Sequence, residues 1–219
     1  MPMVSRHSIQ ARARTVALRL AAEYPGTVDQ LCALDHNGPF QLLVATILSA
    51  QCTDEQVNRV TPQLFAAYPH PEDLAEAPVE EVERIVRPTG FFRAKARSLI
   101  NMSNALVDRF DGKVPQDMDD LTSLPGVGRK TANVVRSVAF GLPGLPVDTH
   151  VGRISRRLGL TSETDPDKVE ADLNMLVRAE DRGAFSLRMI LHGRAVCKAR
   201  KPLCQVCVLA DVCPSAGSF

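Results

Sequence analysis

The sequence contains no tryptophan, and aromatic residues make up only 5% of its 219 residues. It therefore offers no obvious aromatic platform on which a ligand could stack. Long apolar runs are absent too: the longest, at residues 42–50, is far shorter than the roughly 20 residues of a membrane-spanning helix. The N-terminus also lacks the apolar core and cleavage site of a signal peptide. We therefore expect neither a membrane protein nor a secreted one.

Acidic residues are missing from two stretches of the chain. None occurs before Glu23, and none occurs between Arg182 and Ala210, although both stretches contain several arginines. The net charge is nevertheless only +1, because acids gather elsewhere in the chain. Such segregated charge lets a near-neutral protein present a basic face to a polyanion. On charge alone, solvated helix faces are the simpler interpretation.

Strand-like alternation is scarce, whereas apolar residues at helical spacing recur along the whole chain. Ala13, Val16 and Leu20 predict a first helix that packs on a core. Residues 40–50 are apolar on nearly all sides, as in a buried central helix. Later helices are predicted at residues 149–158, 166–179 and 184–195. We therefore predict an all-α protein, with its natural seam at the Pro- and Gly-rich residues 143–146.

Cysteines are few, but four of the six gather near the C-terminus in the spacing Cys-x6-Cys-x2-Cys-x5-Cys. They are Cys197, Cys204, Cys207 and Cys213. A loop of this kind can wrap four thiolates around one compact inorganic centre. Without a signal peptide, such clustering indicates a metal site rather than disulfides. Zinc also accepts four thiolates, but its sites usually consist of two separated Cys-x2-Cys pairs, so zinc is the weaker alternative to an iron–sulfur centre.

Residues 124–130, Leu-Pro-Gly-Val-Gly-Arg-Lys, join two predicted helices by a tight turn. We expect Gly126 and Gly128 to take positive φ and to bring backbone amides close to a ligand. The next helix begins at once, so its unpaired N–H groups and its dipole favour an anion there. DNA phosphate is the obvious anion, and such contacts position a protein without reading sequence. The alternative is a plain connection in which the glycines only allow tight packing.

Two polar residues close to this turn could carry chemistry. Lys130 lies in the first turn of the following helix, where a cation costs stability unless it serves a purpose. Alone, it would more often be a surface charge or a phosphate contact. Asp148 opens the next helix, and an N-cap role would suffice to explain it. The two residues together are more informative. A nucleophilic lysine needs a nearby carboxylate that accepts and returns protons and that stabilises the positive charge on a sugar as its leaving group departs.

These residues belong to a wider set of motifs. LPGVGRKTANVV at residues 124–135, VDTH at 147–150 and the cysteine tail resemble the endonuclease III family of helix–hairpin–helix DNA glycosylases. LSAQ-x-TD, GFFRAKA and LHGR add to the match, at residues 48–54, 90–96 and 191–194. The resemblance thus covers nearly the whole chain. It implies a base-excision repair enzyme that removes oxidised pyrimidines from duplex DNA and cleaves the resulting abasic site.

The resemblance also assigns roles to the two polar residues and the turn. Lys130 would attack the sugar C1′, expel the damaged base and form a Schiff base, after which β-elimination cuts the strand. Asp148 would assist deprotonation and stabilise the oxocarbenium-like state. Gly126, Val127 and Gly128 would hold a phosphate through their backbone amides.

Four further residues are implied as DNA contacts. Gln51 would fill the gap left by the extruded nucleotide, since a base must be flipped out before it can react. Phe91 would wedge against the opposite strand, although a core position beside Phe92 is an equally good interpretation. Lys201 lies in a basic loop that would touch the DNA backbone. His150 is included with these contacts, but it could instead complete a packing network.

By the same resemblance the fold has two all-α lobes. A six-helix barrel would occupy residues 31–142, with the helix–hairpin–helix at about 117–140. Residues 1–30 and 143–219 would form the second lobe, in which the four cysteines ligate a 4Fe–4S cluster. The implied partner is damaged double-stranded DNA, bound by a monomer. The compact chain without a leader favours a bacterial, cytoplasmic protein associated with the nucleoid.

Two alternatives stay open at this point. A monofunctional mismatch glycosylase of the same superfamily generally lacks lysine at this position, and the adenine-specific members carry an extra C-terminal domain. Lys130 and the end of the chain at Phe219 speak against it. A non-catalytic DNA-binding or redox-sensing protein could keep the turn and the cysteines. The presence of both Lys130 and Asp148 favours an enzyme instead.

Overall fold

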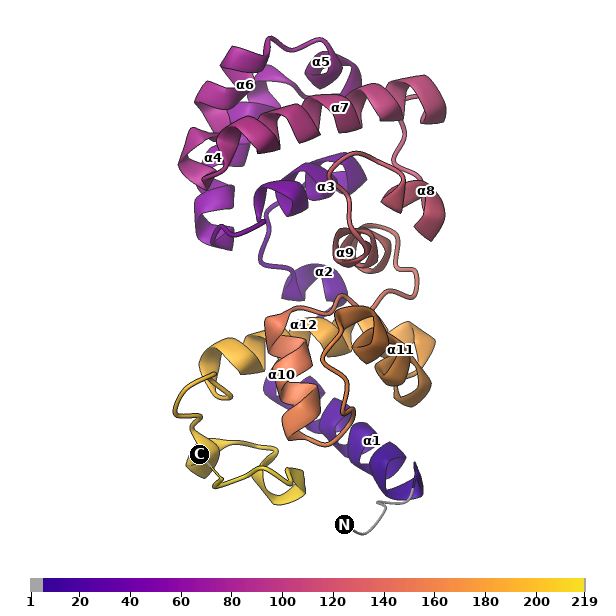
Figure 1. Cartoon of the computed structure of the whole chain (residues 1–219), viewed down its shortest axis with the longest axis vertical. Coiled ribbons are helices and arrows are strands. Elements are labelled where there is room, and N and C mark those ends of the chain that lie inside the picture. Colours follow the sequence, from indigo (N-terminus) through magenta and orange to yellow (C-terminus); the bar gives the residue numbers. More distant parts are fainter. Residues whose placement is uncertain (1–5, 219) are drawn as a thin grey trace. The chain divides into compact units, whose positions relative to one another are not determined.

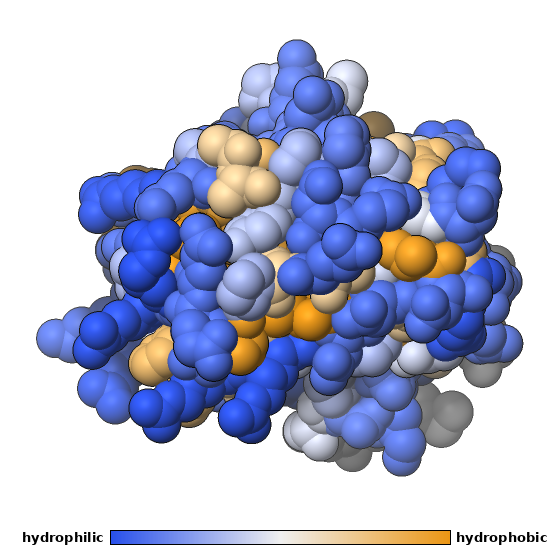
Figure 2. Space-filling view, turned by 90° about the horizontal axis from the view of Figure 1, so that it is seen from above, coloured by the Kyte–Doolittle hydropathy of each residue, from blue (hydrophilic) through white to orange (hydrophobic). Residues whose placement is uncertain are grey.

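The structure, a computed structural model, describes residues 6–218, with side chains from residue 9 onward (Figure 1). All regular elements in this range are helices, so the all-α prediction is confirmed. None of these helices combines the length and the apolar character that a bilayer crossing requires. Hydrophilic side chains cover most of the face shown in Figure 2, where apolar side chains form small separate patches.

The helices form two compact units, each with a hydrophobic core of its own. One unit is Cys32–Phe140. The other combines the described parts of Met1–Leu31 and Gly141–Phe219. The division at Gly141 lies just before the Pro- and Gly-rich seam at residues 143–146.

The Cys32–Phe140 unit contains α3 (Gly38–Leu48), α4 (Asp54–Ala67), α5 (Pro71–Ala75), α6 (Val79–Val86), η1 (Arg87–Thr89), α7 (Phe92–Phe110), α8 (Met118–Thr122) and α9 (Arg129–Ala139). Helix α3 is its centre, and all of residues 42–48 are buried, as the apolar pattern predicts. Helices α4, α7 and α9 pack around α3. The Thr53 hydroxyl starts α4 by accepting a hydrogen bond from the Gln56 amide at 3.2 Å.

The second unit contains α1 (Arg6–Glu23), α2 (Val28–Leu31), α10 (Thr149–Arg157), α11 (Pro166–Leu176), η2 (Ala179–Asp181), α12 (Arg182–Ala195), η3 (Cys204–Val206) and η4 (Ala210–Val212). Helix α1 buries Ala13, Val16 and Leu20, as predicted. The helix predicted at 166–179 ends earlier, at Leu176, because the backbone becomes extended at Val177.

Helix α1 also binds the C-terminal loop. The Arg19 guanidinium donates to the Val208 carbonyl at 2.9 Å and forms an ion pair with Asp211. Arg12 donates to the Leu158 carbonyl at 2.9 Å. The second unit therefore consists of the two ends of the chain held against each other.

Candidate active site and metal centre

A short hairpin joins α8 to α9 and carries the predicted phosphate cradle. Gly126 has φ +80, and a Cβ there would lie 2.9 Å from the Cβ of Ser98 on α7. Conformation and close packing therefore both require glycine at this position. The expectation of positive φ is wrong for Gly128, whose φ is −91 because it is the extended N-cap residue of α9. A Cβ on Gly128 would meet no atom within 4 Å, so this backbone faces open space.

Lys130 lies in the first turn of α9, and its side chain is exposed. No acidic residue shares that turn. The amides of a first helical turn have no partner within the helix, and together with the helix dipole they make this end electropositive. Val127 and Leu124 are buried and fix the hairpin to the core of its unit. The hairpin thus presents an exposed amine beside backbone that favours an anion.

Asp148 is the N-cap residue of α10, in the other unit. Its Oδ1 accepts a hydrogen bond from the Val151 amide at 2.8 Å, so the capping interpretation is confirmed. The side chain is half-buried. Capping occupies one carboxylate oxygen and does not exclude a second role for the other. The structure therefore fixes the position of this carboxylate at the start of α10.

His150 and Arg153 form a network one turn into α10. The Arg153 guanidinium lies 3.1 Å from His150 Nδ1 and donates to the Gly193 carbonyl at 3.2 Å and the Cys197 carbonyl at 2.8 Å. Burial lowers the pKa of Arg153, and the nearby Cys197 opposes this change. A Cβ on Gly193 would come within 2.6 Å of the His150 ring, so glycine is needed there for packing. His150 is thus held tightly by its neighbours.

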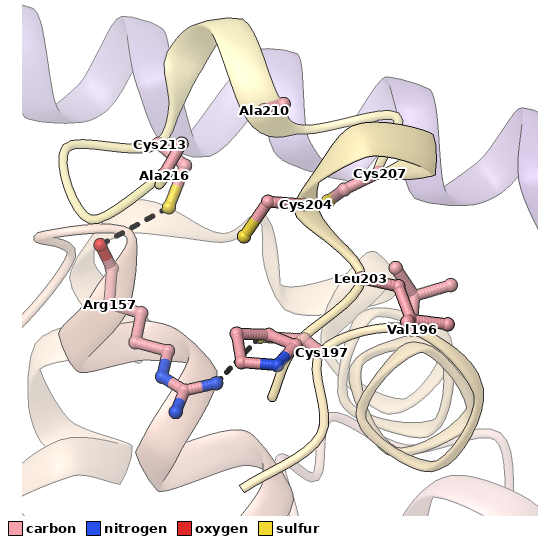
Figure 3. Close-up of a pocket in the computed structure, with 10 residues that line it drawn as sticks. Arg157, Val196, Cys197, Leu203, Cys204, Cys207, Ala210, Cys213 and Ala216 are labelled. Atoms are coloured by element: carbon pink, nitrogen blue, oxygen red, sulfur yellow. Dashed lines mark hydrogen bonds between the residues drawn. The ribbon is translucent and has the colours of Figure 1, made fainter. Parts of the chain in front are cut away.

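The four predicted ligands line one cavity together with Arg157 (Figure 3). Arg157 donates to Cys197 Sγ at 3.3 Å and to the Lys198 and Ala199 carbonyls at 2.8 and 2.9 Å. Its own carbonyl accepts from Cys213 Sγ at 3.4 Å. All four thiols are free of disulfides and half-buried. The guanidinium of Arg157, at the end of α10, therefore holds the cysteine loop through these hydrogen bonds.

These residues fit a cluster better than a single metal ion. No three His, Cys, Asp or Glu side chains among the described residues converge closely enough to bind one ion. A tetrahedral zinc needs such convergence, whereas the thiolates of a four-iron cluster bind separate irons and lie further apart. Burial raises the pKa of Cys207 and of Cys213, and neighbouring thiolates raise it further. Thiolates in this cavity therefore need a positive centre to stabilise them, as an iron–sulfur cluster would.

Backbone strain coincides with the predicted DNA contacts. Among residues 6–218, the non-glycine residues with positive φ are Gln51, Phe91, Asp111 and Lys201, with φ values of 54, 49, 54 and 51. Asp111 ends α7 beside Gly112, a common place for this conformation. The other three are among the four residues whose side chains are implied as DNA contacts, and His150 is the fourth. Left-handed backbone costs roughly 1–2 kcal/mol for such residues and tends to persist at functional sites.

Phe91 is exposed at 68%, so its alternative interpretation as a core aromatic is wrong. Its neighbour Phe92 is the residue that packs against the core. The guanidinium groups of Arg87 and Arg93 lie 5.8 and 5.6 Å from the Phe92 ring centre. The left-handed turn therefore holds the Phe91 ring out in solvent, while the Phe92 ring packs against the core.

Sequence reasoning missed the residues that support these sites. Arg153 and Arg157 bind residues that lie much later in the chain. Arg157, for example, donates to Cys197, which is 40 positions further on. His192, 1% exposed, bridges Tyr24 at 3.2 Å and Cys207 Sγ at 3.4 Å, and burial lowers its pKa. The sequence did contain one signal, since arginines recur on α10 directly after VDTH.

Two family descriptions match this chain. Residues 44–179 match the HhH-GPD superfamily base excision DNA repair protein, and residues 197–213 match the iron–sulfur binding domain of endonuclease III. An endonuclease III from Synechocystis sp. is 54% identical over 210 residues, covering 95% of this chain and 94% of the relative. These matches define a helix–hairpin–helix protein of base excision DNA repair.

Solved structures agree. A non-covalent endonuclease III–DNA complex is similar with a TM-score of 0.90 and 41% identity, covering 99% of this chain and 98% of the other. A trapped endonuclease III–DNA covalent intermediate has a TM-score of 0.90 and 42% identity, with 99% of both chains covered. The chain belongs to the endonuclease III family of the HhH-GPD superfamily. It is a DNA glycosylase with abasic-site lyase activity, and its cofactor is a 4Fe–4S cluster.

Proposed function

We propose that this protein removes oxidised pyrimidines from damaged double-stranded DNA, with Lys130 as the nucleophile and Asp148 as its proton-handling partner. The observation that carries the assignment is the exposed Lys130 amine in the first turn of α9, directly after the hairpin. A cation is unfavourable at a helix N-terminus, so this position is explained best by a bound anionic substrate. The solved covalent intermediate of a relative 42% identical to this chain supports an enzyme–DNA bond.

The reaction would proceed in two covalent steps. The lone pair of Lys130 Nζ forms a bond to C1′ while the glycosidic bond breaks and its electrons leave with the base, which gains a proton. The amine loses a proton to Asp148, and the sugar ring opens to a Schiff base. Loss of a C2′ proton then forms a C2′–C3′ double bond and expels the 3′ phosphate. Water finally hydrolyses the Schiff base and releases Lys130.

The DNA contacts would come from backbone amides and from side chains, several of which belong to residues with positive φ. The amides of Gly126 and Gly128 would bind a phosphate, with support from the open space beside Gly128. The third amide expected in this role, that of Val127, instead donates to the Leu124 carbonyl at 3.1 Å. Gln51 and Phe91 would enter the base stack, because a flipped base leaves a gap that must be filled. Lys201 is exposed in the cluster loop and would contact a phosphate. His150 would add a contact near Asp148.

The two compact units would be the barrel and the cluster lobes of this family. Cys197, Cys204, Cys207 and Cys213 would hold the 4Fe–4S cluster, which when bound fixes the loop that carries Lys201. We further propose that the protein is a monomer that acts on nucleoid DNA in the cytoplasm, and its bacterial relatives support the cytoplasmic location.

Borohydride trapping tests the proposal. The holoenzyme is incubated with a duplex that carries one thymine glycol and, separately, with an abasic-site duplex. We expect a covalent protein–DNA band on both duplexes, and its loss in Lys130→Gln. The exposed Lys113→Gln is the matched control and should keep the band. A band on the abasic duplex alone would contradict the proposed base specificity. No band on either would instead favour a monofunctional glycosylase or a non-catalytic DNA-binding protein.

A further inference from the structure

Lys95 is a buried lysine whose side chain the proposed reaction does not use. It lies in the first turn of α7 and is only 5% exposed. Lysine is rarely buried unless its charge has a partner. Here the amine donates a hydrogen bond of 2.7 Å to the Thr89 carbonyl. No carboxylate contacts this amine in the part of the chain that the structure describes. A buried ammonium held by one carbonyl is costly, so it calls for an explanation.

The carbonyl that Lys95 binds belongs to the turn that holds Phe91 in solvent. Thr89 is itself 2% exposed, and its hydroxyl donates to the Val86 carbonyl at 2.8 Å. The backbone amide of Lys95 binds the Phe91 carbonyl at 3.0 Å. Lys95 thus binds the carbonyls of both neighbours of Gly90 in the chain. Gly90 and Phe91 have φ values of 71 and 49, so this turn needs such support.

The second strained turn, at Gln51, belongs to the same compact unit as Lys95. Cys52 is half-buried, packs against the core, and opposes the lowering of the Lys95 pKa by burial. It directly follows Gln51, whose φ is 54. The hydrogen bonds of Lys95 therefore reach one of the two turns whose exposed side chains would enter the DNA, the Phe91 turn.

We propose that Lys95 is a positioning residue for base extrusion, which holds the Phe91 turn in the conformation that enters the base stack. This inference rests on the proposed role of Phe91. The amine acts only through the turn and does not reach substrate. The two hydrogen bonds from Lys95, to the Thr89 and Phe91 carbonyls, can hold the strained turn before DNA arrives. Binding energy is then not spent on forming the turn.

A double-mutant cycle on the holoenzyme tests the inference. Lys95→Met should lower single-turnover excision of thymine glycol about 10- to 100-fold, because a misplaced wedge opens the duplex poorly. In a Phe91→Ala background, Lys95→Met should lower the excision rate by less than about a further 3-fold, since the two residues act as one unit. Cleavage of a preformed abasic site, which has no base to extrude, should fall much less. The exposed Lys113→Met is the control and should leave excision unchanged.

A spectroscopic measurement separates positioning from general damage to the fold. A 2-aminopurine placed opposite the lesion should brighten when wild-type protein unstacks it, and should brighten less with Lys95→Met at saturating protein. Normal brightening with that variant, or additive effects of Lys95→Met and Phe91→Ala, would overturn the inference. If Phe91→Ala itself excises normally, the proposed wedge role fails with it. If Phe91→Ala is slow and Lys95→Met is not, only the inference fails.

Gly90→Ala covers the case in which Lys95→Met does not fold. A Cβ on Gly90 would meet no atom within 4 Å, so the core is untouched, but φ 71 with ψ 159 is unfavourable for alanine. The turn should therefore change shape while the protein stays folded. Slow excision with near-normal abasic-site cleavage would support the inference. Normal excision would refute it, since Lys95 is proposed to act through this turn.

Discussion

At the scale of single residues, Asp148 combines a structural contact with a proposed chemical role. Its Oδ1 caps α10 by accepting from the Val151 amide, and this bond needs only a side-chain oxygen. Asparagine supplies that oxygen and is an equally good N-cap, but it cannot accept a proton. The two roles can therefore be separated by one substitution.

Asp148→Asn should melt close to the wild type and lose base excision by about 10²- to 10⁴-fold, as expected for a missing general base. Asp148→Ala should lose the same activity and in addition about 1 kcal/mol of stability. Thermal melting and single-turnover excision measure the two effects. Asp165→Asn, at the N-cap of α11, is the matched control and should keep both properties. An active Asp148→Asn protein would leave capping as the whole explanation of this residue.

At the scale of elements, the α8–α9 hairpin contains two glycines with different tasks. Gly126 has positive φ and lies against Ser98, whereas Gly128 has ordinary φ and faces open space. The first glycine therefore serves the fold, and the second leaves room in front of the backbone. This distinction is invisible in the sequence, where both glycines suggest positive φ equally well.

Gly126→Ala should destabilise the protein by at least about 1–2 kcal/mol, because alanine resists left-handed backbone. Gly128→Ala should melt like the wild type but bind undamaged duplex DNA more weakly, since its methyl group stands where a phosphate would approach. Fluorescence anisotropy at fixed salt gives the affinity, because such contacts depend on ionic strength. Unchanged affinity of Gly128→Ala would argue against phosphate binding at this backbone.

The elements themselves follow closely from local sequence. Apolar spacing predicts α1, and the run that is apolar on nearly all sides predicts α3. The cysteine spacing predicts the loop that lines the cavity. Local patterns do not reveal which lysine is buried, so Lys95 escapes sequence analysis. They also do not reveal contacts between distant segments, such as that of Arg157 with Cys197, because these depend on how helices pack.

At the scale of the whole molecule, the buried Lys95 should make stability depend on pH. Burial lowers its pKa from the usual 10.5, while the nearby Cys52 opposes this change. Between the lowered value and 10.5, the unfolded chain binds more protons than the folded protein, so the free energy of unfolding rises with pH in that window. Below the window the amine is charged in both states, and no gain is expected.

Urea unfolding of wild type and Lys95→Met, followed from neutral pH to about pH 10, measures this contribution. We expect the wild type to gain stability relative to the variant as the pH rises through the window. Lys113→Met, which removes an exposed amine, should follow the wild type. Parallel curves for wild type and Lys95→Met would mean that the Lys95 amine titrates alike in both states.

The pairing of α1 with the C-terminal loop has a consequence for biosynthesis. Arg19 and Asp211 are 192 positions apart, so α1 leaves the ribosome long before the residues that it binds. The Cys32–Phe140 unit is continuous in sequence, and its whole chain leaves the ribosome before residues 141–219. The first helix made must therefore wait, with Val16 and Leu20 uncovered, until α11 and α12 emerge, and the bonds of Arg19 form only when the C-terminal loop follows. Slow translation of the tail would lengthen this wait and make the nascent chain more dependent on chaperones.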